Sequence, residues 1–174
     1  MKNVWMIAQE LAINYPQRVD KMVLTCTFAR KDGTSGFSSE INKAIEAYEK
    51  SSRDRASQIK LASVFMDSIF NRWSYRVFIL PLIKLAIRFS AIKGSAEQSE
   101  ALMAHDAADR LGMIKASTLV LTGTEDRLVN PVSSEVIASL VPGAKLVKVL
   151  GGGHSFSAEM SGEFNREVLD FLRN

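Results

Sequence analysis

The chain has 174 residues, a length that fits one domain with a single buried core. Hydrophobic residues make up 47% of it and charged residues 24%, a balance that excludes a disordered or fibrous protein. The formal net charge of +3 is too small to indicate nucleic-acid binding unless the basic residues gather in one patch.

The first predicted elements are a helix and a strand. Apolar residues recur every three or four positions until Pro16 ends the pattern, and they are Val4, Ile7, Ala8, Leu11, Ala12 and Tyr15. Residues 21–27 form a short apolar run with polar and glycine residues after it, which predicts a strand buried on both faces. A helix that leads into such a strand is half of a βαβ unit.

Residues 33–95 show no strand pattern and predict a helical cap insertion made of several short helices. Pro81 is expected to bend or end one of them, because it lacks an amide donor and its ring clashes with the preceding turn. The segment from Arg53 to Lys93 holds eight basic residues and two acidic ones. A solvated helical face explains this bias better than an anionic ligand or a membrane surface does.

After residue 106 the alternation of strands and helices resumes. The pattern predicts a strand at 118–122, a helix at 133–140, a strand at 145–150 and a helix at 163–172. Right-handed crossovers place consecutive parallel strands side by side, so we expect a three-stranded parallel sheet with helices on both faces. Residues 1–32 and 96–174 would then form the core of an α/β fold around the insertion at 33–95.

The sequence shows no pattern typical of metal-binding, secreted or membrane proteins. Cys26 is the single cysteine, which excludes an internal disulfide and gives no metal-ligand spacing. No signal-peptide pattern is visible, and no apolar run approaches the roughly 20 residues of a membrane span. We therefore expect no cofactor, no metal, no membrane or nucleic-acid partner, and a cytoplasmic location.

Two loops that directly follow predicted strands carry residues suited to catalysis, at the strand ends where open parallel sheets bind ligands. Residues 123–131 read Gly-Thr-Glu-Asp-Arg-Leu-Val-Asn-Pro, and residues 151–156 read Gly-Gly-Gly-His-Ser-Phe. They resemble the α/β-hydrolase superfamily, in which Gly-x-x-Asp-x-x-Val-x-Pro holds the catalytic acid and a glycine-histidine loop holds the base. The resemblance implies that Asp126 is the acid and His154 the base of a Ser-His-Asp triad, in the family's chain order.

Residues 6–24 resemble the helix after the family's nucleophile elbow and the strand that follows it. The family has Gly-x-Ser-x-Gly-Gly just before this point, whereas this chain reads Lys2-Asn3-Val4-Trp5. Lys2 stands where the serine would be, and a flexible, protonated lysine cannot replace it. We therefore expect a truncated, partial α/β-hydrolase fold that keeps the acid and the histidine and is inactive as this chain alone.

Two other side chains were candidates for a nucleophile. Ser155 adjoins His154, but neighbours in sequence rarely adopt the geometry of a nucleophile and its base. Cys26 lies near the carboxyl end of a strand, where the role of a small buried hydrophobic residue is favoured over that of a reactive thiol.

Two functions stay open for this chain. Residues 6–24 and 105–111 look most like the enol-lactonase and small-ester hydrolase branch, which implies an ester or lactone hydrolase. Its N-terminal half would lie on another chain or be missing from the sequence given. The alternative is a non-catalytic binding or interaction module. Because the strand at 21–27 would lack one neighbour, its open edge and the apolar first helix predict a homodimer through residues 1–27.

Overall fold

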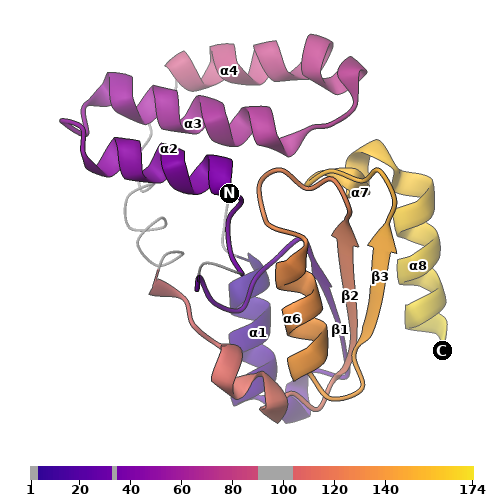
Figure 1. The fold of residues 1–174 in the computed structure, drawn as a ribbon. Helices are drawn as coiled ribbons and strands as arrows, with labels where there is room; N and C mark the ends of the chain where they lie inside the picture. Colours follow the sequence, from indigo (N-terminus) through magenta and orange to yellow (C-terminus); the bar gives the residue numbers. More distant parts are fainter. Residues whose placement is uncertain (1–3, 33–34, 90–103) are drawn as a thin grey trace.

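A computed structural model describes residues 4–32, 35–89 and 104–174, which form a three-stranded parallel sheet flanked by helices (Figure 1). The strands are β1 (Lys21–Thr25), β2 (Ser117–Gly123) and β3 (Lys145–Val149), in the spatial order β1-β2-β3. This is the predicted α/β architecture with its predicted strand order. All three strands end at the same edge of the sheet, so the loops that follow them meet there.

Helices cover both faces of the sheet. Helices α1 (Val4–Asn14) and α6 (Val132–Leu140) pack on one face, and α8 (Ser161–Arg173) packs on the other (Figure 1). Successive residues of β2 point to opposite faces, so Val120 joins the core under α1 and α6 while Leu119 joins the core under α8. In the part of the chain that the structure describes, no helix has the length and hydropathy needed to cross a bilayer.

Helix α1 turns a different face to the sheet than its apolar spacing predicts. The buried residues are Met6, Gln9, Ala12 and Ile13, whereas Ile7 and Leu11 are 62% and 45% exposed. Most positions of this helix are apolar, so apolar residues recur every three or four positions on two overlapping faces. The spacing alone therefore does not predict which face is buried. The result is an apolar stripe on the surface of α1.

Strand β1 is buried less completely than expected. Met22 and Leu24 are buried, but Lys21, Val23 and Thr25 on the opposite face are partly exposed. Helix α8 covers that face only in part: the Lys21 ammonium reaches the carbonyl of Leu172 at 2.9 Å. Within the described residues β1 pairs with β2 alone and forms one edge of the sheet.

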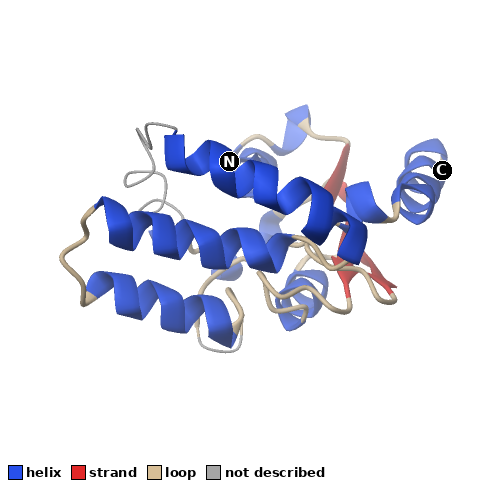
Figure 2. Cartoon of the chain, turned by 90° about the horizontal axis from the view of Figure 1, so that it is seen from above, coloured by secondary structure: helices blue, strands red, loops and turns tan. Residues whose placement is uncertain are grey.

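Three helices form a layer beyond the carboxyl edge of the sheet. They are α2 (Ser39–Glu49), α3 (Arg55–Ile69) and α4 (Leu80–Phe89), with α3 between the other two (Figures 1 and 2). The Ser38 hydroxyl and the Asp54 carboxylate cap the starts of α2 and α3. The expected boundaries of the insertion, at residues 33 and 95, lie outside the described residues.

Pro81 changes the type of the helix rather than ending it. A π-helical turn, Tyr75–Ile79, comes directly before α4, and Pro81 is the second residue of α4. A wider turn before a proline separates its ring from the preceding carbonyls, and the missing amide donor falls near the start of the new helix. The helical run therefore continues through Pro81 to Phe89.

The helical layer is attached to both loops that the sequence singles out. At the start of α2, the Ser38 amide donates to the Leu128 carbonyl at 2.9 Å. At the end of α3, the Ser155 amide donates to the Ile69 carbonyl at 3.1 Å. The buried Glu159 carboxylate accepts hydrogen bonds from the amides of Asn71, at 3.0 Å, and Arg72, at 2.6 Å. The layer is thus held directly over the carboxyl edge.

Replacing Glu159 with alanine should destabilise the protein by about 2 kcal/mol, because the amides of Asn71 and Arg72 lose a charged acceptor in a partly buried site. Urea unfolding measures this change. Glu49→Ala, at an exposed position at the end of α2, is the matched control and should stay within about 0.5 kcal/mol of the parent. Equal stabilities for the two variants would contradict the proposed attachment.

Candidate functional site

The loops after β2 and β3 lie in direct backbone contact. The Thr124 amide donates to the Val149 carbonyl at 3.0 Å, and the Glu125 amide donates to the Gly152 carbonyl at 2.9 Å. Gly123 makes this contact possible, since a Cβ atom there would lie 2.2 Å from the Gly152 carbonyl oxygen. The contact fixes the loop of Asp126 against the loop of His154.

Asp126 is held in one conformation by its own loop. Its Oδ1 accepts hydrogen bonds from the amides of Leu128, at 2.8 Å, and Val129, at 2.9 Å. The side chain is fully buried, so these amides replace the water that a carboxylate needs. Oδ2 remains available to a third donor.

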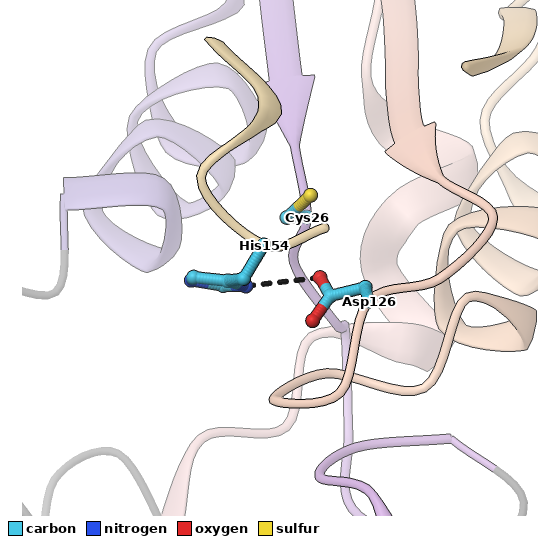
Figure 3. Close-up of side chains that lie close together, drawn as sticks. All are labelled: Cys26, Asp126 and His154. Carbon is cyan, nitrogen blue, oxygen red and sulfur yellow. Dashed lines mark hydrogen bonds and ion pairs between the residues drawn. The ribbon is translucent and has the colours of Figure 1, made fainter. Parts of the chain in front are cut away.

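His154 provides that donor. Its Nδ1 lies 2.9 Å from Oδ2 of Asp126, and its far ring nitrogen points away from Asp126 and Cys26 (Figure 3). Because an ionised carboxylate can only accept, Nδ1 carries the hydrogen, and the neutral ring then has its lone pair on Nε2. The His154 side chain is 11% exposed, against 0% for Asp126. The structure therefore brings the two predicted site residues into hydrogen-bond contact, with Nε2 as the free basic atom.

Cys26 joins this pair in a way that the sequence did not reveal. It follows β1 in the left-handed backbone region, with φ of 47°, and is 2% exposed. Its Sγ and the ligand atoms of Asp126 and His154 all lie within 4.8 Å of one another (Figure 3). Burial raises the pKa of the Cys26 thiol well above its usual value, and the Asp126 carboxylate raises it further. At neutral pH Cys26 is a thiol, which argues against a role as thiolate nucleophile.

Of the other candidate nucleophiles, only Ser155 lies among the described residues. Lys2 lies outside the described residues. Ser155 is the residue before the short helix α7 (Phe156–Glu159), and its amide, not its hydroxyl, makes the recorded contact with Ile69. Among the described residues, Asp126 is the only recorded hydrogen-bond partner of the His154 ring.

Sequence reasoning missed Asn71 and Glu159 as neighbours of the site. The Asn71 side chain donates to the Glu125 carbonyl at 2.9 Å and lies against Gly153. The Glu159 carboxylate accepts hydrogen bonds from the backbone amides of Asn71 and Arg72, and it thereby holds the turn after α3 in place. The acidic residue after the histidine loop is a weak signal of this contact. Its partners are the amides of Asn71 and Arg72, which lie 88 and 87 residues earlier in the sequence, and no spacing rule connects them.

The sequence is similar to those of known hydrolases. Residues 6–159 match the family described as alpha/beta hydrolase fold. The RutD protein of Azorhizobium caulinodans, named as a carbamate hydrolase, is 27% identical over 174 residues, covering 95% of this chain and 61% of the relative. The 2-hydroxy-6-oxo-6-phenylhexa-2,4-dienoate hydrolase of Burkholderia cepacia is 40% identical over 77 residues, covering 44% of this chain and 27% of the relative.

Solved structures show the same fold. A hydrolase from Pseudomonas aeruginosa PA01 superposes with a TM-score of 0.75 and 24% identity, covering 97% of this chain and 61% of that one. The enol-lactonase from Burkholderia xenovorans LB400 gives a TM-score of 0.72 and 22% identity, covering 100% of this chain and 64% of that one. The chain thus spans less than two thirds of the length of these proteins. With residues 6–159 matched, it belongs to the alpha/beta hydrolase fold family.

Proposed function

We propose that Asp126 and His154 are the acid and the base of a site that hydrolyses carboxylic esters or lactones. The observation that carries this proposal is the 2.9 Å contact between Nδ1 and Oδ2, with Oδ1 saturated by two backbone amides. This arrangement fixes the ring tautomer that a general base requires, since the Nε2 lone pair is left free. The names of two relatives, a carbamate hydrolase and an enol-lactonase, support hydrolysis at an acyl carbon.

The chemistry divides between the two side chains. His154 Nε2 accepts the proton of a hydroxyl nucleophile as the oxygen attacks the acyl carbon, and then gives that proton to the leaving group, which leaves the acyl group on the nucleophile. Water then attacks this acyl group while Nε2 takes the water's proton and passes it to the departing nucleophile oxygen, which releases the carboxylic acid. Asp126 keeps the ring oriented and stabilises the imidazolium formed between these steps. The residues of the helical layer over the carboxyl edge would select the substrate.

Among the described residues, the hydrogen bonds of the His154 ring do not identify a nucleophile. We propose that the nucleophile comes from a segment that pairs with the open edge of β1, and that residues 1–174 alone do not turn over. A segment corresponding to the part of the relatives that this chain does not cover is the simplest source. Residues 1–174 would then supply the acid and the base, and that segment the nucleophile.

Complementation tests this proposal. The 174-residue chain is produced alone and together with the part of the Azorhizobium caulinodans relative that it does not cover, and hydrolysis of activated esters and lactones is measured. The chain alone should stay at the rate of free imidazole. The mixture should turn over, and His154→Ala should lower its rate by more than about 10³-fold.

Two outcomes would reject the catalytic role. A stable complex without turnover is one, and turnover that survives His154→Ala is the other. If a lactone or ester raised the unfolding temperature of the chain without being hydrolysed, the non-catalytic binding module would replace the hydrolase.

We also propose that, without such a segment, the chain forms a homodimer through residues 1–27. Two features support this: β1 pairs only with β2 within the described residues, and α1 exposes Ile7 and Leu11 beside it. A second copy related by a two-fold axis would cover both the strand edge and the apolar stripe.

Light scattering on charge-bearing variants tests the dimer. Leu11→Glu should weaken association by roughly tenfold or more, because it places a carboxylate in the covered stripe. Leu169→Glu is the matched control, since Leu169 on α8 is 47% exposed, close to the 45% of Leu11. A folded monomer of the parent chain at micromolar concentration would rule out the dimer.

A further inference from the structure

We propose that Cys26, Asp126 and His154 together form a binding site for a thiophilic divalent cation, with Zn²⁺ as the best match. The three side chains follow three different strands and converge at the carboxyl edge of the sheet (Figure 3). They supply a thiol sulfur, a carboxylate oxygen and an imidazole nitrogen, which are the three donor types that zinc prefers in proteins. The residues are far apart in sequence, so the spacing of the ligands does not predict the site.

The distances are close to those of a zinc site. All three donor atoms lie within 4.8 Å of one another, and the carboxylate oxygen and ring nitrogen are 2.9 Å apart. A tetrahedral Zn²⁺ with bonds of about 2.0 to 2.3 Å separates its ligands by roughly 3.3 to 3.6 Å. The cation therefore requires the sulfur to approach and the Asp126–His154 pair to open slightly. Rotation of short side chains provides movements of this size.

The charges also suit a buried cation. A thiolate and a carboxylate together carry two negative charges, the imidazole is neutral, and Zn²⁺ makes the group neutral overall. Burying a neutral assembly avoids the desolvation penalty that an isolated ion would suffer at this buried position. The cation itself drives deprotonation of the thiol when it binds.

The ligands are supported by the backbone around them. Asp126 is oriented by the amides of Leu128 and Val129, and Cys26 by the hydrogen bond from its amide to the Leu121 carbonyl at 3.0 Å. Such secondary contacts hold ligands in place and raise metal affinity. Three protein ligands leave the fourth position of a tetrahedral ion for water or another small donor.

Metal binding and base catalysis would exclude each other at this site. The cation takes the Asp126 oxygen and the His154 nitrogen that otherwise share a proton. Without that hydrogen bond, His154 loses the contact that fixes its tautomer as a general base. Zn²⁺ would therefore act as an inhibitor of the proposed hydrolase, although its binding to the chain does not depend on any turnover.

Titration of the 174-residue chain with Co²⁺, a spectroscopic substitute for Zn²⁺, tests the site directly. We expect one equivalent to bind with a thiolate-to-cobalt charge-transfer band in the near ultraviolet, and added Zn²⁺ to abolish it. Cys26 is the only cysteine, so such a band reports this sulfur and no other. Absence of the band in the parent chain at saturating Co²⁺ overturns the proposal, whether or not any variant folds.

Variants then identify the other ligands. Cys26→Ser and His154→Gln should each weaken Co²⁺ binding by about 100-fold or more. His105→Gln is the matched control: it removes the other histidine of the chain, which contacts Gln9, and it should leave the band and the affinity unchanged. Affinity that is equal in the parent and in His154→Gln, or that falls only in His105→Gln, overturns the proposed ligand set.

Discussion

Replacing Gly123 with alanine is expected to destabilise the protein by about 3 kcal/mol, the upper range for overpacking a buried site. The added Cβ would lie 2.2 Å from the carbonyl oxygen of Gly152 and 2.8 Å from that of Gly153. Both obstacles are backbone atoms, so no side-chain rotation can relieve the overlap. The loop of His154 must move away from the loop of Asp126, which separates the two side chains.

Urea unfolding and the histidine ring signals in an NMR spectrum measure the two consequences of this substitution. Gly162→Ala is the matched control, because nothing lies within 4 Å of its added Cβ and the residue is in α8. That variant should be neutral or more stable by up to about 1 kcal/mol. If Gly123→Ala retained both the stability and the His154 signals of the parent, the close contact between the two loops would be wrong.

The features that could be predicted from the sequence follow from the geometry of parallel sheets. Strands that alternate with helices must all point the same way, so Asp126 and His154, each just after a strand, had to lie at one edge. Their contact at 2.9 Å follows once β2 and β3 are neighbours. The strand order predicted their shared edge, whereas the choice of these two residues as acid and base came from the resemblance of their loops to the α/β-hydrolase superfamily.

Other features depend on contacts between distant parts of the chain. The sequence favours a small core residue at Cys26 because nothing in it indicates a reactive thiol, and only the pairing of β1 with β2 brings it beside Asp126. The face of α1 is decided by where the sheet lies, since Ile7 and Met6 are equally apolar and only Met6 is buried. The support of Asn71 by Glu159 joins two loops with no shared pattern.

Asp126→Asn should leave the fold nearly intact and reverse the tautomer of His154. The asparagine oxygen must stay at the position of Oδ1, because the amides of Leu128 and Val129 both donate to it. Its NH₂ group then faces Nδ1 of His154, where two donors cannot meet. The ring responds by moving its hydrogen to Nε2 and accepting at Nδ1, so the atom that would receive the nucleophile's proton in the proposed mechanism is already protonated.

We expect Asp126→Asn to lower kcat of the complemented hydrolase by about 10⁴-fold, because the general base is held in the wrong tautomer. The free energy of unfolding should fall by only about 1 kcal/mol, because the hydrogen bonds become weaker but are not lost. The ¹⁵N shifts of the His154 ring distinguish the two neutral tautomers in the isolated chain, so this test does not depend on turnover. Asp170→Asn, exposed on α8, is the matched control and should change neither quantity. An Asp126→Asn ring that still carried its hydrogen on Nδ1 would mean that the carboxylate does not set the tautomer, and the proposed division of roles between Asp126 and His154 would fail.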